Sequence, residues 1–395
     1  PLIKLLKKGH HGVELTDKEW QTLYNWIDFN APYHGKFKAN VFKGVEQISR
    51  RTELTEKYAG SGVDWKAEIR SYADYLSKQE KPAAVKPERK EYKDKEVKLK
   101  GWPFDAATAK AMLSKETETQ KSIELAPGIR MNFVRVPAGS FVMGSNRGHS
   151  DYSPVSKQVV KKAFWMGEIE VSNEQFRTIF PEHNSRFIGQ LWKDHVHEGY
   201  PANNPEQPAI RVSWQEAMDF CKKLSEKTGL NVTLPTEVQW EWACRAGSDD
   251  DFWYGSLNTD FAKFENLADV QLNKAAVRGV NPQPMNPNDS WYKYYTYQPK
   301  ENGVDDGNML MVKGGSYQAN PWGLYDMQGN VAEWTRSDYM PYPYNEKAQD
   351  GTGTEKVARG GSWTEHPKTC TSYYRKAYLP WQKVYNVGFR VIIED

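Results

Sequence analysis

Three places in residues 131–395 carry the polar and apolar pattern of a helix with a capped start. In each, a Ser or Thr lies three positions before a Glu or Gln, a spacing that lets both side chains bind free backbone amides. The pairs are Ser172 with Gln175, Ser213 with Glu216, and Thr236 with Gln239. After Ser213, apolar residues recur on one helical face at Ala217, Phe220, Cys221 and Leu224. The pattern predicts a helix at each place.

Elsewhere in residues 131–395, short apolar runs alternate with Gly, Pro, Asn and Asp. Residues 257–323 show no sustained period of either helix or strand. A segment of this kind must be held together by tight turns, aromatic packing or metal ions. The sequence therefore predicts an irregular α+β domain with little regular secondary structure.

The amino-terminal part has a different, helical pattern. Thr16 and Glu19 have the capping spacing, and Trp20, Leu23 and Ile27 then fall on one helical face. The helix is expected to stop at residues 30–32, because Pro disfavours a helical residue before it. A second helix is expected over residues 64–76. Residues 1–77 are thus predicted to be a small helical unit, the tail of a larger domain.

Residues 78–130 are expected to connect the two parts. Residues 78–100 are rich in Lys and Glu and contain two prolines, which is typical of a solvated linker or an exposed helix. Asp105 can cap a short helix that runs toward Lys121. The predicted organisation is therefore residues 1–77, 78–130 and 131–395.

Composition excludes two classes of partner. The chain has 395 residues and a formal net charge of +2, which argues against a dedicated nucleic-acid surface. No apolar run approaches the eighteen or so residues that span a bilayer. The chain begins at Pro1 without a signal-like segment, so we expect it to be a mature or truncated piece of a longer protein. Its three cysteines are too few for a disulfide framework, and Cys221 and Cys244 occupy core-like helical positions.

Seven strings along the chain carry a family resemblance. They are VPAGSFVMGS at 136–145, EIEVSNEQF at 168–176, PAIRVSW at 208–214, LPTEVQWEWACRAG at 234–247, WGLYDMQGNVAEW at 322–334, RGGSW at 359–363 and GFR at 388–390. In this order they resemble the formylglycine-generating enzyme, or sulfatase-modifying factor, family. The resemblance implies an irregular α+β fold related to C-type lectins. That fold hosts thiol oxidases, sulfoxide synthases and non-catalytic modules, so it does not decide function.

A weaker resemblance concerns the amino-terminal part. Residues 5–35, 50–59 and 102–106 look like the end of a domain related to the hydrazine synthase alpha subunit. Large extracytoplasmic proteins of some bacterial groups carry such a domain before a sulfatase-modifying module. This implies a periplasmic, outer-membrane-associated or secreted location. No C-x-x-C-H haem-attachment string is present in the sequence.

The resemblance also implies where catalysis would occur. In copper-dependent members, two cysteines five residues apart follow the GGS turn and bind Cu(I), which soft thiolates select. Cys370 matches the second cysteine, but Glu365 stands at the first, and a carboxylate is a hard ligand. Ser362 and Trp334 match other pocket positions. We therefore expect copper chemistry to be lost. One alternative is an iron or zinc site built from Glu365, His366 and Cys370. The other is that these three are ordinary loop residues that bind no metal.

Calcium is the cofactor that the resemblance favours. Asn330, Val331 and Glu333 lie in a block where family members hold calcium with side-chain and backbone oxygens. A second loop is matched by Asn266, Leu267 (through its carbonyl), Asp306 and Asn308. Oxygen ligands at irregular spacing suit calcium. The alternative is that Asn330 and Glu333 only cap turns and pair with Arg390.

Aromatic residues gather at 253–254, 291–297 and 339–344. They could line a groove for a peptide or a glycan, or they could be ordinary packing. The leading hypothesis is a sulfatase-modifying-type domain without thiol oxidase activity that acts as an extracytoplasmic binding or assembly module for a protein or peptide. An active oxidase that uses Cys370 is the first alternative, and a carbohydrate-binding module of lectin-like fold is the second.

Overall fold

The computed structural model describes residues 6, 15–20, 56–57, 60, 64–78, 97–188, 200–274, 301–345 and 353–395. The chain divides into two compact units, Pro1–Glu91 and Tyr92–Asp395. The second unit therefore begins before residue 131, the boundary that the sequence suggests. Most of the Lys- and Glu-rich stretch and the aromatic residues 291–297 lie outside the described residues.

Unit Pro1–Glu91 contains helix α4, Trp65–Lys78, close to the predicted bounds. Its start is capped by Asp64, whose carboxylate accepts a hydrogen bond from the Ala67 amide at 3.0 Å. The predicted capping pair also forms, since the Glu19 carboxylate accepts from the Thr16 amide at 2.8 Å. The expected continuation of that helix over residues 21–32 lies outside the described residues.

The segment before residue 120 belongs to the second unit because its aromatic side chains pack into the core. Trp102 lies against Phe104, Phe141 and Trp242, with ring centroids 5.7, 5.7 and 5.9 Å apart. Part of the expected connector is therefore core.

Helix α5 spans Ala106–Leu113, and its cap Asp105 accepts from the Thr108 amide at 2.8 Å. The helix stops well before Lys121, the end that the sequence predicts. The following residues form strand β1, Gln120–Ala126, which pairs antiparallel with β2, Ile129–Val136. Hairpin pairing with the next strand along the chain has overridden the local helical signal.

Four small sheets make up the rest of the unit. The largest has the order β1-β2-β5-β13-β8, with β5 Phe164–Gly167, β13 Ile392–Glu394 and β8 Asn231–Thr233. The second has the order β11-β10-β9-β12, with β11 Arg375–Tyr378, β10 Lys356–Arg359, β9 Ala332–Asp338 and β12 Val387–Gly388. The two-stranded sheets are β3 Gly139–Met143 with β4 Ser156–Val160, and β6 Phe187–Ile188 with β7 Tyr200–Pro201. The described residues also include three short 3-10 helices: η2 Ser150–Tyr152, η4 Val270–Lys274 and η6 Pro367–Thr369.

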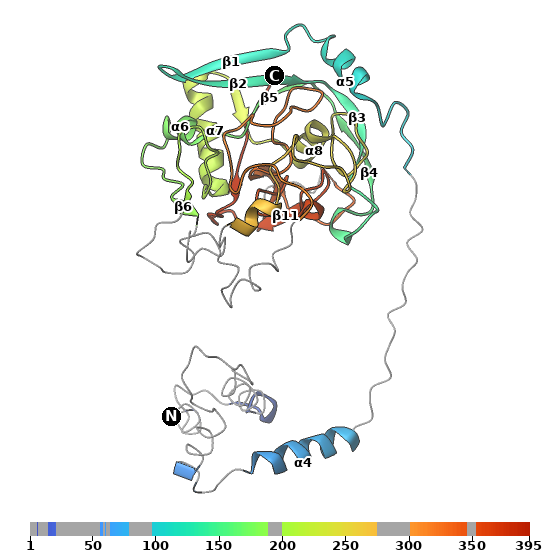
Figure 1. Ribbon diagram of the computed structural model, residues 1–395, viewed down its shortest axis with the longest axis vertical. Coiled ribbons are helices and arrows are strands. Elements are labelled where there is room, and N and C mark those ends of the chain that lie inside the picture. Colours follow the sequence, from blue (N-terminus) through green and yellow to red (C-terminus); the bar gives the residue numbers. More distant parts are fainter. Residues whose placement is uncertain are drawn as a thin grey trace. The chain divides into compact units, whose positions relative to one another are not determined.

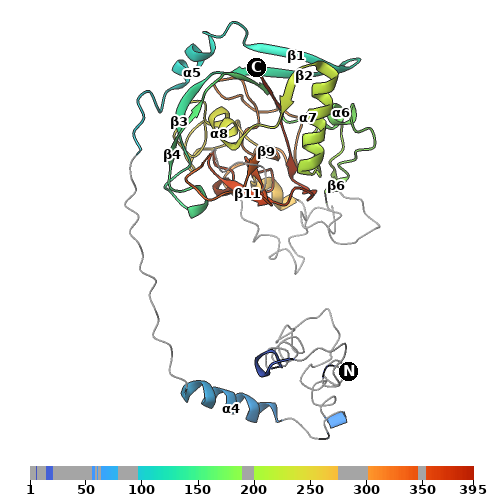
Figure 2. The same cartoon turned by 180° about the vertical axis from the view of Figure 1, so that it is seen from behind.

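All three predicted helices form, and each begins with the predicted capping box. They are α6 Asn173–Arg177, α7 Trp214–Thr228 and α8 Glu237–Arg245. Helix α7 buries the predicted stripe from Ala217 to Leu224, whereas α8 is buried almost all round and includes Trp240 and Trp242. Figures 1 and 2 show α6 and α7 at one side of the unit and β3 and β4 at the other.

Buried charges connect the irregular segments. Arg390 is fully buried, and its guanidinium donates to both oxygens of Glu333 at 2.7 and 2.8 Å. It also donates to the backbone oxygens of Gly167 at 3.2 Å and of Tyr325 at 2.9 Å. A single side chain thus binds the end of β5, the loop before β9 and β9 itself.

Replacing Arg390 with Met should lower the free energy of unfolding by about 3 kcal/mol or more, because it leaves the Glu333 carboxylate buried without a cation. The matched control is Arg336→Met. Its pair with Glu394 is about 29% exposed on both sides, so its loss should cost about 1 kcal/mol or less. Urea unfolding measures both variants. Equal losses of unfolding free energy in the two variants would show that the buried Arg390 pair stabilises the fold no more than the partly exposed Arg336 pair.

Candidate functional site

The RGGSW turn after β10 places Cys370 against the backbone. Gly361 has φ +73°, and a Cβ added there would lie 2.3 Å from the Cys370 sulfur, so only glycine fits. The thiol is fully buried in a cluster with Phe252, Phe261 and Leu267. It donates a weak hydrogen bond to the Glu365 carbonyl oxygen at 3.7 Å.

Burial raises the pKa of the Cys370 thiol, and the nearby Glu365 charge raises it further. The neutral thiol is therefore the favoured form, while both metal binding and nucleophilic attack need the thiolate. Cys221 and Cys244 are likewise free and buried, and burial raises the pKa of each. All three cysteines are therefore free thiols in the core, and none forms a disulfide.

Glu365 lies in a polar network on the other side of the same turn. Its carboxylate oxygen Oε1 forms an ion pair with Lys376 on β11 and accepts from the Asn386 side-chain amide at 3.2 Å. Asn386 also donates to the Ser362 hydroxyl oxygen at 2.8 Å. The structure thus brings Ser362, Glu365 and Cys370 into one neighbourhood.

Trp334, another predicted site residue, lies in a different hydrophobic cluster from Cys370. Its ring is fully buried and meets the Tyr378 ring edge-on, with centroids 5.8 Å apart. Its indole N–H donates to the Val212 carbonyl at 2.9 Å. A packing role accounts for both contacts.

His366 does not join a metal centre with Glu365 and Cys370. Its Nε2 pairs with the Glu301 carboxylate at 2.8 Å, and its Nδ1 accepts from the Lys368 amide at 3.2 Å. Among the described residues, no group of three or more His, Cys, Asp and Glu side chains is arranged to hold a metal ion. The alternative iron or zinc site therefore has no support in this loop.

The loop with Asn266 and Asp306 has the donors that a hard cation needs. The side-chain oxygens Oδ1 of Asn266 and Oδ2 of Asp306 are buried and have no hydrogen-bond partner. Burial and repulsion from Asp269 raise the pKa of Asp306 to about 7. Partnerless buried oxygens are costly unless something compensates them, so these residues fit calcium. Leu267 is buried beside them, and the Asn308 amide donates to Asp306 at 2.7 Å.

The block with Asn330, Val331 and Glu333 fits calcium less well. Both Glu333 oxygens are bound to Arg390, and one also accepts from the Trp240 indole at 2.7 Å. The Asn330 side-chain oxygen accepts from the Val312 amide at 2.9 Å. Glu333, an expected calcium ligand, is therefore already paired with Arg390, which is the alternative that the sequence analysis left open.

Three acids that the sequence analysis did not select lie in this region. Glu170, Glu265 and Asp326 each have one buried carboxylate oxygen without a partner. Burial raises the pKa of Glu170 and Glu265, and it raises that of Asp326 to about 6. Glu170 and Asp326 lie inside two of the family strings. Membership of these strings was the only feature of the sequence that could have pointed to them.

The aromatic residues at 253–254 pack within the protein and do not line a groove. Tyr254 stacks on Phe252 and Phe264, with centroids 5.0 and 4.5 Å apart. The Trp253 indole donates to Glu265 at 3.0 Å. Tyr342 and Tyr344 are also buried. The rings at 253–254 therefore have packing contacts, whereas Tyr344 also lines a pocket of about 340 Å³ beside β4.

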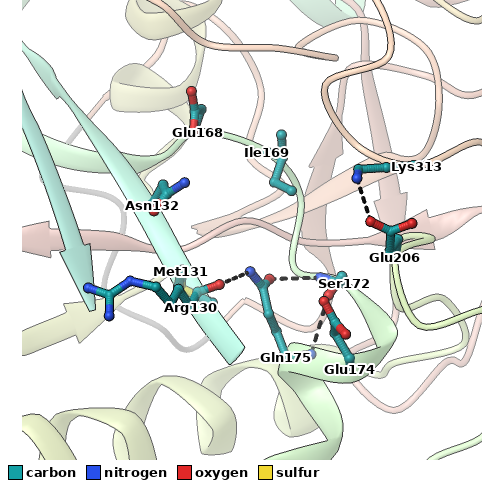
Figure 3. A pocket seen from close by; sticks show the side chains of 10 residues that line it. All are labelled: Arg130, Met131, Asn132, Glu168, Ile169, Ser172, Glu174, Gln175, Glu206 and Lys313. Atoms are coloured by element: carbon teal, nitrogen blue, oxygen red, sulfur yellow. Dashed lines mark hydrogen bonds and ion pairs between the residues drawn. The ribbon is translucent and has the colours of Figure 1, made fainter. Parts of the chain in front are cut away.

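Figure 3 shows a pocket of about 190 Å³ at another place, between β2, α6 and residue 313. Lys313 and Glu206 form an exposed ion pair beside it, and the Gln175 amide donates to the Arg130 carbonyl at 2.8 Å. None of the predicted site residues lines this pocket.

Comparison with known proteins decides the family. Residues 119–395 match the family described as the sulfatase-modifying factor enzyme 1-like domain. The chain belongs to this family. The match confirms the resemblance that the seven strings indicate and begins at β1, whereas the resemblance of the amino-terminal part stays a prediction.

Two relatives show how distant the similarity is. The mouse formylglycine-generating enzyme is 25% identical over 307 residues, which cover 65% of this chain and 73% of that protein. Inactive C-alpha-formylglycine-generating enzyme 2 of Bos taurus is 26% identical over 284 residues, which cover 62% of this chain and 80% of that protein.

Solved structures confirm the fold. PvdO from Pseudomonas aeruginosa superposes with a TM-score of 0.52 at 22% identity, covering 71% of this chain and 100% of that one. Treponema denticola variable protein 1 superposes with a TM-score of 0.51 at 19% identity, and the match also covers 71% of this chain and 100% of that one. The sulfatase-modifying-factor-type domain therefore has the irregular, C-type-lectin-related α+β fold with few helices. No helix among the described residues is long and apolar enough to span a membrane.

Proposed function

We propose that this sulfatase-modifying-factor-type domain lacks copper thiol oxidase activity and acts as an extracytoplasmic binding or assembly module for a protein or peptide partner. The observation that carries the proposal is the ion pair between Glu365 and Lys376. It occupies the position where the resemblance puts the first of two copper-binding cysteines. A carboxylate is a hard oxygen donor, and this one is already paired with an ammonium group, so it does not offer Cu(I) the soft donor that it selects.

The surroundings of Cys370 support the same reading. Its thiol lies among aromatic and aliphatic side chains, and burial favours the protonated form, so a lone reactive thiolate is disfavoured. The relative named inactive C-alpha-formylglycine-generating enzyme 2 is a precedent for a family member of that description.

A binding role is supported by one surface feature. Trp381 follows β11 and is 65% exposed, the largest value for a big hydrophobic side chain in the described part of the chain. Trp is enriched among the residues that dominate binding energy at protein interfaces.

We also propose that calcium binds at Asn266, Leu267, Asp306 and Asn308 as a structural ion. The partnerless oxygens of Asn266 and Asp306 support this site. Calcium there would neutralise the Asp306 charge and join two loops that have little regular structure.

The unmodified chain, given copper and oxygen, should leave a Cys-x-Pro-x-Arg peptide unconverted, because it lacks the pair of soft thiolates. Mass spectrometry detects conversion of Cys to formylglycine as a change in peptide mass. Cys370→Ser should behave like the unmodified chain, and the Streptomyces coelicolor formylglycine-generating enzyme serves as the positive control. Turnover that disappears in Cys370→Ser would establish an active oxidase instead.

Calcium should raise the Tm of chelator-treated protein, since an ion bound only by the folded state adds about 2.7 kcal/mol at one hundred times its Kd. Asp306→Asn should lose most of this shift. The control is Asp260→Asn, an exposed acid-to-amide change on the same stretch of chain, which should keep the shift. If protein proven free of calcium shows no shift, or if Asp306→Asn keeps it, calcium does not bind there.

A further inference from the structure

The Glu365 carboxylate lies in a small, largely enclosed polar space. Its side chain is 13% exposed and that of Lys376 is 24% exposed. The segments around them come from the turn after β10, from β11 and from the loop before β12. A charge pair at this depth is poorly screened by water and is stronger than a surface pair.

Three tyrosines lie close in sequence to this network: Tyr374 and Tyr378, two positions either side of Lys376, and Tyr385, next to Asn386. Residues two apart in a strand point to the same face, so Tyr378 lies on the Lys376 face of β11. Burial raises the pKa of all three tyrosines. Tyr378 also packs on the buried Trp334, which fixes its position.

Hydrogen bonds orient the carboxylate toward a cation. The Asn386 amide nitrogen bridges the Ser362 hydroxyl oxygen at 2.8 Å and Glu365 Oε1 at 3.2 Å. The backbone oxygen of Glu365 accepts from the Ala268 amide at 3.0 Å, which anchors the residue from a further loop. The second carboxylate oxygen, Oε2, is buried and has no partner in the described part of the chain.

Lys376 supplies the positive charge that this arrangement requires. Burial alone would lower the pKa of Lys376, and the Glu365 carboxylate more than offsets this, so its pKa lies above the usual value. The side chain therefore stays an ammonium group although it is largely buried. Without it, Glu365 would carry an unpaired charge in the enclosed space.

We propose that Glu365, oriented by Asn386 and largely buried, forms a binding site for a primary ammonium group, and that the chain fills this site with its own Lys376. The site takes ammonium because a carboxylate in an enclosed space needs a compact cation with several N–H donors. The position of the missing cysteine is thus closed by an internal ligand. This inference goes beyond the absence of oxidase activity, since it names the chemical class that the site accepts.

The test empties the site and offers it a free ligand. Lys376→Ala should lower the Tm by about 5 °C or more, because it leaves Glu365 buried without a cation. Propylammonium at tens of millimolar should restore at least half of that loss, while propanol, which has the same shape and no charge, should not. The control Lys383→Ala, which breaks the exposed pair with Glu216, should show neither a comparable loss nor a rescue.

The carboxylate is tested in the double variant Glu365→Gln/Lys376→Ala, which should not respond to propylammonium. Equal rescue by propanol, or rescue of the double variant, would show a cavity and no ammonium site.

If Lys376→Ala does not fold, Lys376→Met is compared with Glu365→Gln/Lys376→Met. The double variant should then be the more stable, because it has no unpaired charge. A double variant that is no more stable than Lys376→Met would overturn the proposal. These stability measurements do not depend on catalysis, so their outcome is separate from that of the peptide assay.

Discussion

The Arg390 guanidinium pairs with Glu333 in the interior and donates to backbone oxygens in two loops far apart in the sequence. A buried charge of this kind is tolerated only when all its donors are used, so the loops must run where they supply acceptors. A second buried group combines two ion pairs: Arg359 pairs with Glu241, and Arg375 pairs with Glu237 at 2.8 Å. In a unit with short strands and few helices, these charge networks take over part of the role of regular hydrogen-bond ladders.

The same requirement explains the site at residue 365. A carboxylate at the place of a family cysteine would be unfavourable in an enclosed turn if it stood alone. Here it is paired with Lys376 and oriented by Asn386, and the neighbouring thiol of Cys370 remains in the apolar cluster behind it. Under the proposed function, the ion pair of Glu365 with Lys376 stands where the resemblance puts a soft cysteine ligand.

Local signals in the sequence were the reliable ones. The capping boxes at Ser172, Ser213 and Thr236 predicted three helices correctly, because a helix start depends on residues within one turn. The resemblance pointed to Ser362, Glu365 and Cys370, and the structure brings these three residues close together; their functional role stays a prediction. Two features could not be predicted in this way: strand β1, which forms a hairpin with β2, replaced the end of an expected helix, and Trp102 joined the core. The role of Lys376 was also hidden, since an ion pair across eleven residues and two segments leaves no local pattern.

The central claim is that the closed ion pair at Glu365 has replaced a soft-metal site. A Cu(I) titration under anaerobic, reducing conditions, in competition with a chromogenic Cu(I) chelator, tests it most directly. The unmodified chain should take no Cu(I) from an equimolar amount of chelator, and Cys370→Ser should give the same curve. Transfer of one equivalent of Cu(I) to the unmodified chain, lost in Cys370→Ser, would contradict it.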